Sequence, residues 1–193
     1  MTTWHWVRHG PTHEKSFVGW RDVPADLSDT ARTGRLTAYL PRTALVVSSD
    51  LSRAVATADV LAHHDRKRLH HAPALREMHF GVWDGMHFAD VAIRDPELSR
   101  AFWEEPGDIA APEGESWNQT AARVNTAVDA INAQYTGSHI IAVAHFGVIL
   151  TQVQRALDVS PYEAFSHKID NLSVTELSHD DGRWQATRIN HCP

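Results

Sequence analysis

Residues 3–12 read Thr-Trp-His-Trp-Val-Arg-His-Gly-Pro-Thr. β-Branched and aromatic residues alternate up to Val7, and Gly10-Pro11 then breaks the pattern. Such a pattern predicts a short strand that ends in a loop. Arg8 and His9 are therefore expected at the carboxyl end of the first strand.

A second strand is predicted at 44–48, a short apolar run that contains β-branched residues. Apolar residues then recur at helical spacing from Leu51 to Ala62, and Ser49-Asp50 offers side chains that can cap this helix. Arg53 is consequently expected in the first turn of a helix that follows a strand.

A third strand is predicted at 140–144, where every residue is apolar. A run of this kind is expected for a strand that is buried on both faces. His145 follows the run directly, and the pattern from Gly147 onward predicts another helix. The three strands thus share one feature, a cationic or imidazole side chain close to the carboxyl end.

The rest of the chain is predicted to form loops, helices and a hairpin. Residues 11–27 show no sustained period and form a long loop of the kind that usually carries function. Helices are expected at residues 28–40 and from Ser116 through Ile131, with weaker patterns at 88–93 and 98–103 after an irregular stretch at 75–85. Asp181-Gly182 is a hairpin signal between two strands near the C-terminus.

Length and composition favour one globular domain over residues 1–193, because 42% hydrophobic and 22% charged residues are typical of folded proteins. The net charge of −6, with scattered basic residues, gives no footprint for nucleic acid. The single cysteine, Cys192, excludes a disulfide within the chain. No apolar stretch reaches the roughly 20 residues that span a bilayer. We expect a cytoplasmic protein without a membrane segment and, since the first motif begins at Arg8, without a removable leader.

If the three strands are neighbours, their end residues meet in one crevice, because ligands of open α/β sheets bind at the carboxyl ends of the strands. Guanidinium groups suit phosphate, and an imidazole can attack phosphorus. The sequence therefore points to a phosphate site that contains Arg8, His9, Arg53 and His145. The N-terminus of the helix that carries Arg53 would add a favourable dipole.

Residues 8–12, Arg-His-Gly-Pro-Thr, resemble the signature of the histidine phosphatase superfamily, which also contains the cofactor-dependent phosphoglycerate mutases. Residues 48–54 are similar to the family's second-arginine segment, 75–85 to its segment with the catalytic acid, and 143–147 to its second-histidine segment. The segments follow one another in the family's order. The resemblance implies a phosphoglycerate mutase-like fold, a three-layer α/β/α sandwich with a mostly parallel central sheet.

The resemblance also implies a mechanism with two displacements. His9 takes the phosphoryl group as a covalent nucleophile, and water then releases it. Glu77 donates a proton to the leaving oxygen and later activates the water. Arg8, Arg53 and His145 stabilise the charge on the phosphoryl oxygens, so neither a metal nor another cofactor is expected.

Other residues are expected to contact the substrate. Thr12 offers a hydroxyl, and Arg21 lies in a loop that resembles a substrate-facing loop of the family, although a solvated arginine explains it equally well. Gly10 and Gly147 lie close to the two histidines, where backbone without a Cβ can approach phosphate. The predicted substrate-binding residues are thus Arg8, Arg53, Thr12, Gly147 and Arg21.

The chain departs from the family pattern after the first motif. Pro11 replaces the usual Glu or Gln, and Glu14-Lys15 replaces a Trp-Asn pair, so one amide donor to phosphate is missing. Lys15 is either a substitute for that donor or a solvated surface lysine. Residues 113–116 resemble a segment that borders the pocket in relatives, but helix capping explains them as well.

Histidine pairs and tryptophans carry no assigned role. Adjacent histidines point in different directions, and no carboxylate spacing supports a metal site at 63–64 or 70–71. Trp20, Trp83 and Trp103 could wall a substrate cavity, but packing is the default for each.

The sequence is compatible with three candidate functions. A phosphatase acting on a small phosphorylated metabolite is favoured over a phosphoglycerate mutase, because no Arg-rich substrate segment is found between Glu77 and His145. A catalytically silent module that binds phosphorylated ligands is disfavoured, because all five core residues are present. Sugar phosphates, a ribazole phosphate and phosphoglycerate-like acids all stay open as substrates, and so does assembly into a homo-oligomer.

Overall fold

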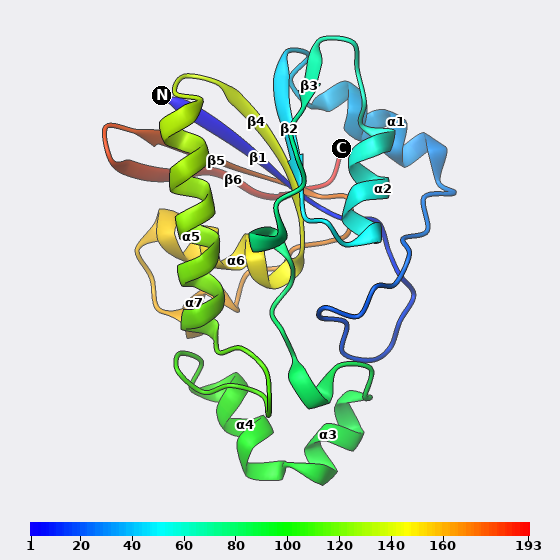
Figure 1. Cartoon of the computed structure of the whole chain (residues 1–193), viewed down its shortest axis with the longest axis vertical. Coiled ribbons are helices and arrows are strands. Elements are labelled where there is room, and N and C mark those ends of the chain that lie inside the picture. Colours follow the sequence, from blue (N-terminus) through cyan, green and yellow to red (C-terminus); the bar gives the residue numbers. More distant parts are fainter.

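The computed structural model describes residues 1–193 and has one six-stranded sheet at its centre (Figure 1). The strand order is β3-β2-β4-β1-β5-β6. The first four strands in this order are parallel, β5 pairs antiparallel with β1, and β6 pairs antiparallel with β5. The strands are β1 (Thr2–Arg8), β2 (Ala44–Ser48), β3 (Arg66–Arg68), β4 (His139–Ala144), β5 (Val174–Asp180) and β6 (Arg183–His191).

Helices join the strands and cover both faces of the sheet, as Figure 1 shows. None of them is long and apolar enough to span a membrane. The α-helices are α1 (Thr30–Tyr39), α2 (Ser52–Val60), α3 (Phe88–Arg94), α4 (Pro96–Glu104), α5 (Trp117–Gln134), α6 (Phe146–Leu157) and α7 (Pro161–Ala164), and short 3₁₀ turns lie at Pro73–Leu75 and Gly81–Trp83.

Two hydrophobic cores form because successive side chains of a strand point to opposite faces. On one face, Ile140 and Ala142 of β4 pack in a cluster with residues of α5 and α6. On the other face, Ile141 and Val143 pack with residues of α1 and α2. The expected three-layer α/β/α architecture with a mostly parallel sheet is confirmed.

Two local predictions were incomplete or wrong. β3 was not predicted, because its sequence Arg66-Lys-Arg68 has no apolar pattern and it lies at the edge of the sheet. The expected cap of α2 by Ser49-Asp50 is also wrong, since Leu51 is the N-cap residue and makes no side-chain cap bond. Asp50 is instead ion-paired with Arg76 at 2.6 Å.

Residues 77–104, between β3 and β4 in the chain, form an excursion that carries α3 and α4. These two helices lie at one end of the molecule, apart from the sheet (Figure 1). Phe88 at the start of α3 and Trp103 near the end of α4 are both partly exposed. The excursion begins with Glu77 of the predicted site, and its aromatic residues therefore lie beside that site.

Candidate active site

The neighbouring strands β2, β4 and β1 bring the predicted residues together, as expected from their parallel order. The main-chain N–H of His9 donates to the carbonyl of Ala144 at 3.1 Å, which extends the β1–β4 pairing by one residue. The rings of His9 and His145 consequently lie 5.0 Å apart between centroids, at an angle of 59°.

The His9 ring is held in one tautomer. Its Nδ1 lies 2.7 Å from the carbonyl oxygen of Gly10. Because a carbonyl can only accept, Nδ1 carries the proton and Nε2 keeps its lone pair. The main chain of His9 is fixed as well, since its carbonyl accepts a bond of 2.8 Å from Nδ2 of Asn171.

Burial is the largest of the effects that lower the pKa of His9 to about 3, and the nearby charges of Arg53 and Arg8 add to it. The hydrogen bond to Gly10 acts in the opposite direction. At neutral pH the ring is therefore an uncharged imidazole. A neutral Nε2 is the form that attacks an electrophilic phosphorus.

Arg53 and Arg8 are positioned by main-chain carbonyls. Arg53 is fully buried, and its guanidinium donates to the carbonyls of Arg21 at 3.0 Å and Gly19 at 2.7 Å. Arg8 donates to the carbonyl of Ile169 at 2.7 Å. The Nε of each arginine is buried without a hydrogen-bond partner.

Neither arginine has a carboxylate within salt-bridge distance, although the charge of Glu77 favours the protonated form of both. Burial lowers the pKa of each guanidinium, because a low dielectric disfavours charge. Arginine nevertheless stays charged in proteins. A fully buried cation, Arg53, and a half-buried one, Arg8, both without a carboxylate partner, form a site beside His9 that is suited to a dianion.

His145 adds a third polar group to the same point. It is fully buried, and neither of its ring nitrogens has a hydrogen-bond partner. Burial, followed by the proximity of His9 and Arg53, lowers its pKa well below the ordinary value. A buried polar ring of this kind can hydrogen-bond a phosphoryl oxygen.

Glu77 is placed by main-chain N–H groups. The N–H of Gly147 donates to Oε1 at 3.1 Å and lies 3.2 Å from Oε2, and the N–H of Met78 donates to Oε1 at 3.0 Å. Its own carbonyl accepts from Nε1 of Trp20 at 2.7 Å and from Arg123 at 2.8 Å. Glu77 is thus fixed at both its main chain and its carboxylate.

Arg123 on α5 is a positioning residue that the sequence did not reveal. Besides Glu77, it binds the carbonyls of Ala74 and Arg76 and pairs with Glu115 at 2.7 Å. Glu115 also accepts from the N–H of His79 at 3.0 Å. Residues 113–116 therefore brace the loop that carries Glu77, while Ser116 caps α5 in a capping box with Gln119, as expected.

Glycine is needed at positions 10 and 147 because of neighbouring protein atoms. A Cβ at Gly147 would lie 2.6 Å from Oε1 of Glu77, and a Cβ at Gly10 would lie 2.6 Å from the side chain of Leu27. Close approach of the main chain to phosphate at these two positions stays a prediction.

A cavity of about 270 Å³ opens beside His9. The cavity lies between the carboxyl end of β1, the start of α6 and the excursion that carries α3 and α4. Its walls are formed by Arg8, His9, Thr12, Glu14, Ser16, Phe17, Val18, Glu77, Phe80, Phe88, Trp103 and Phe146.

Thr12 lines this cavity, whereas Arg21 and Lys15 do not. The guanidinium of Arg21 donates to Glu14 at 2.9 Å and to the hydroxyl of Ser16 at 3.0 Å. Lys15 is exposed. Arg21 acts on the site through its carbonyl, which holds Arg53, and its contact with substrate stays a prediction.

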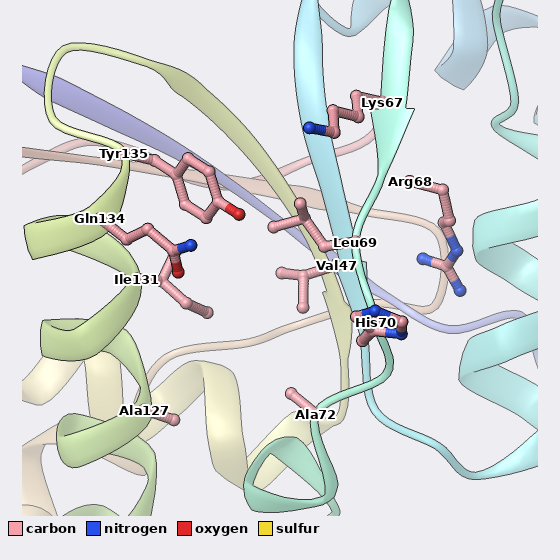
Figure 2. Close-up of a pocket in the computed structure, with 10 residues that line it drawn as sticks. All are labelled: Val47, Lys67, Arg68, Leu69, His70, Ala72, Ala127, Ile131, Gln134 and Tyr135. Carbon is pink, nitrogen blue, oxygen red and sulfur yellow. The ribbon is translucent and has the colours of Figure 1, made fainter.

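A larger cavity, about 720 Å³, lies between α5 and the segment that contains β3 (Figure 2). Figure 2 shows Val47, Leu69 and Ile131 on its walls, together with the basic Lys67 and Arg68. None of the predicted site residues borders it. Cavity size alone would therefore have indicated the wrong place for catalysis.

The His63-His64 pair differs from expectation. The two rings lie 4.1 Å apart between centroids, and the ligand atoms of both histidines and Asp65 lie within 4.8 Å of one another. The carboxylate of Asp65 also accepts from Arg42 at 3.0 Å. Adjacent histidines here do not diverge, but the group is remote from His9 and shares its carboxylate with an arginine.

Residues 5–191 match the model of the histidine phosphatase superfamily, branch 1. The chain belongs to this superfamily. The match includes every residue of the predicted site and explains why the four sequence segments occur in the family's order.

Three similar proteins place the chain within the superfamily. The bifunctional protein Rv2228c of Mycobacterium tuberculosis is 35% identical over 175 residues, which are 90% of this chain and 46% of that protein. A metal-independent phosphoserine phosphatase of Arabidopsis thaliana is 32% identical over 145 residues, 74% of this chain and 59% of that protein. The mycobacterial glucosyl-3-phosphoglycerate phosphatase Rv2419c, solved with VO3, has a TM-score of 0.86 at 27% identity and covers 98% of each chain. The chain thus spans about half the length of the superfamily members Rv2228c and the Arabidopsis phosphatase.

Proposed function

We propose that this chain is a phosphatase that hydrolyses small-molecule phosphate monoesters through a phosphohistidine on His9. The observation that carries the proposal is the bond from Nδ1 of His9 to the carbonyl of Gly10, which leaves Nε2 free beside two unpaired arginines. The Arabidopsis relative and Rv2419c, both named as phosphatases, agree with it.

In the first displacement, Nε2 of His9 attacks phosphorus and the bond from phosphorus to the ester oxygen breaks. Glu77 gives its proton to the departing oxygen, and the alcohol leaves. Arg8, Arg53 and His145 bind the three phosphoryl oxygens, whose charge is spread in the transition state. Because main-chain carbonyls hold Arg8 and Arg53, and His145 is fully buried, little reorganisation is needed at the moment of reaction.

In the second displacement, a water molecule gives a proton to Glu77 and attacks phosphorus, and the bond from phosphorus to Nε2 breaks. Phosphate leaves, and His9 and Glu77 return to their initial states. The positive charge for both steps comes from arginine side chains, so we propose a metal-independent reaction, in line with the name of the Arabidopsis relative. A cytoplasmic location and one catalytic domain over residues 1–193 belong to the same proposal, supported by the lone free Cys192 and the single sheet.

A mutase would have to keep a carboxylated monophosphate in the site between two transfers. Arg94 and Arg100, the arginines of the excursion, do not line the cavity and lie beside Asp95 and Glu104. The site therefore favours release of the alcohol and transfer to water.

The test is phosphate release from an aryl phosphate by purified protein, with and without a metal chelator. We expect turnover that the chelator leaves intact. Loss of turnover on chelation would contradict the metal-independent reaction, and interconversion of 3- and 2-phosphoglycerate faster than phosphate release would favour a mutase. Binding of phosphate esters without turnover would identify a silent module.

A further inference from the structure

The cavity beside His9 changes in character away from the phosphate-binding groups. Glu77, Phe80, Trp103 and Phe146 line the cavity next to His9 and also line a small adjoining crevice of about 30 Å³. Arg8 and His9 do not border that crevice, whose remaining walls are Met78, Gly147 and Phe165. The crevice is thus an apolar and aromatic extension that begins at Glu77.

Glu77 fixes which part of the substrate meets these rings. The proposed proton transfer puts the ester oxygen next to the Glu77 carboxyl, with phosphorus toward His9. The alcohol carbon lies on the other side of that oxygen. Phe80, Trp103 and Phe146 line the crevice together with Glu77, and the centroid of the Phe146 ring also lies 5.4 Å from the guanidinium carbon of Arg8. The alcohol part of the substrate, on the Glu77 side of the ester oxygen, must therefore pack against these rings.

The aromatic wall is continuous and partly open. Ring centroids of Phe17 lie 4.9 Å from Phe80 and 4.5 Å from Phe88, and those of Trp103 and Phe165 lie 5.5 Å apart. Phe88 is 56% exposed and Trp103 38% exposed, which is unusual for large apolar side chains. Both therefore present free ring surface that a ligand can cover.

The charges in the cavity walls disfavour an alcohol part that carries a carboxylate. Arg8 is the only cationic side chain in the walls, and it faces the phosphate position beside His9. The other charged group in the walls is the carboxylate of Glu14, since Glu77 carries a proton when it acts as the acid of the first displacement. The nearby Arg21 is occupied by Glu14 at 2.9 Å and does not line the cavity. A carboxylate on the substrate would find no free cation there and would face Glu14.

We propose that the alcohol part of the substrate is an aromatic group without a carboxylate, seated against Phe80, Phe88, Trp103 and Phe146. This inference rests on the phosphatase activity proposed above and narrows it to one class of ester. Flat rings pack against aromatic side chains in stacked or edge-on contacts that are favourable beyond the apolar area they bury.

The test compares three esters of primary or secondary alcohols, namely 2-phenylethyl phosphate, ethyl phosphate and 3-phosphoglycerate. We expect kcat/KM for 2-phenylethyl phosphate to exceed that for each of the others by about tenfold or more, the size of effect that apolar pockets give. A preference for 3-phosphoglycerate or ethyl phosphate, with phosphate still released, overturns the aromatic-substrate proposal and leaves the phosphatase intact. No phosphate release from any ester overturns the phosphatase and the substrate class with it.

Single substitutions test which side chains cause the preference for the aromatic ester. Phe88→Ala and Trp103→Ala should each lower the ratio of kcat/KM for 2-phenylethyl phosphate over ethyl phosphate by about tenfold. Phe88 is the safer site, because its ring is mostly exposed, whereas Trp103 packs on Phe102 at 4.9 Å. Tyr162→Ala is the matched control, an aromatic residue that is 62% exposed on α7 and outside the cavity. An unchanged ratio in folded Phe88→Ala and Trp103→Ala would refute the proposed contact with the alcohol.

Discussion

The main-chain N–H of Gly147 lies 3.1 and 3.2 Å from the two carboxylate oxygens of Glu77. This relationship joins the first turn of α6, which follows His145, to the loop that carries the predicted acid. The same proximity favours glycine at position 147, since a Cβ there would lie 2.6 Å from Oε1 of Glu77. The position of the predicted acid therefore depends on a main-chain contact between two segments that are 70 residues apart.

Gly147→Ala should reduce turnover by displacing Glu77. The added Cβ would lie 2.6 Å from Oε1, so the carboxylate must shift, and misplacement by about 1 Å costs roughly 10²-fold in rate. The control is Gly34→Ala on α1, where nothing lies within 4 Å of the added Cβ. Steady-state kinetics on an alkyl phosphate check the prediction, and wild-type kcat in Gly147→Ala would show that the contact is irrelevant to the reaction.

His9→Ala should lose almost all turnover and also the acid-labile, base-stable phosphoenzyme, because no other imidazole borders the cavity. The measurement is incorporation of labelled phosphate after a quench in base. His64→Ala is the control, since His64 is exposed and does not line the cavity. A labelled intermediate that persists in His9→Ala would falsify the assignment of the nucleophile.

The depressed pKa of His9 predicts a loss of stability in mild acid. The folded protein keeps this ring neutral down to about pH 3, while the unfolded chain takes up a proton below the ordinary value of 6.5. Stability is therefore fully present above pH 6.5 and falls as the pH decreases from 6.5 toward 3, by about 1.4 kcal/mol for each pH unit from this group.

Urea unfolding at pH 7 and pH 5 tests this linkage. We expect the free energy of unfolding to fall less between the two pH values in His9→Gln than in the wild-type protein, because the variant lacks the titrating group. Equal losses in the two proteins would mean that His9 is protonated at a similar pH in the folded and unfolded states.

The sequence predicted the strand ends correctly because each carries a strong local signal. The apolar runs before Arg8 and His145 end abruptly, and the parallel order of β1, β4 and β2 then brings their ends to one edge of the sheet. β3 escaped prediction because three consecutive basic residues have no hydrophobic period, and pairing with β2 alone makes them a strand.

Contacts between segments that are distant in the chain could not be predicted from the sequence. Nothing in the pattern of α5 marks Arg123, whose bonds to Glu77 and Glu115 exist only after the loop folds against that helix. The ion pair between Arg21 and Glu14 likewise depends on how the loop folds. Trp103 was one of three tryptophans that could border a cavity, and only packing decided that it does.

The role of Glu77 as general acid can be separated from its role as a positioned charge. Glu77→Gln is a suitable variant, because an amide oxygen in place of Oε1 still accepts from the N–H groups of Met78 and Gly147. Formation of the phosphoenzyme from an alkyl ester should slow by about 10²–10⁴-fold, the range typical of general acid catalysis.

An ester of a very acidic alcohol, such as 2,4-dinitrophenyl phosphate, needs no proton on its leaving oxygen and should form the phosphoenzyme in Glu77→Gln at a rate close to that of the wild-type protein. The comparison must use the formation step measured by rapid quench, because Glu77 is also expected to activate water in the second displacement. Steady-state turnover would therefore slow for both esters and hide the difference. Equal slowing of phosphoenzyme formation from both esters would show that Glu77 acts through charge or position, and the proton would then have to come from another group at the cavity.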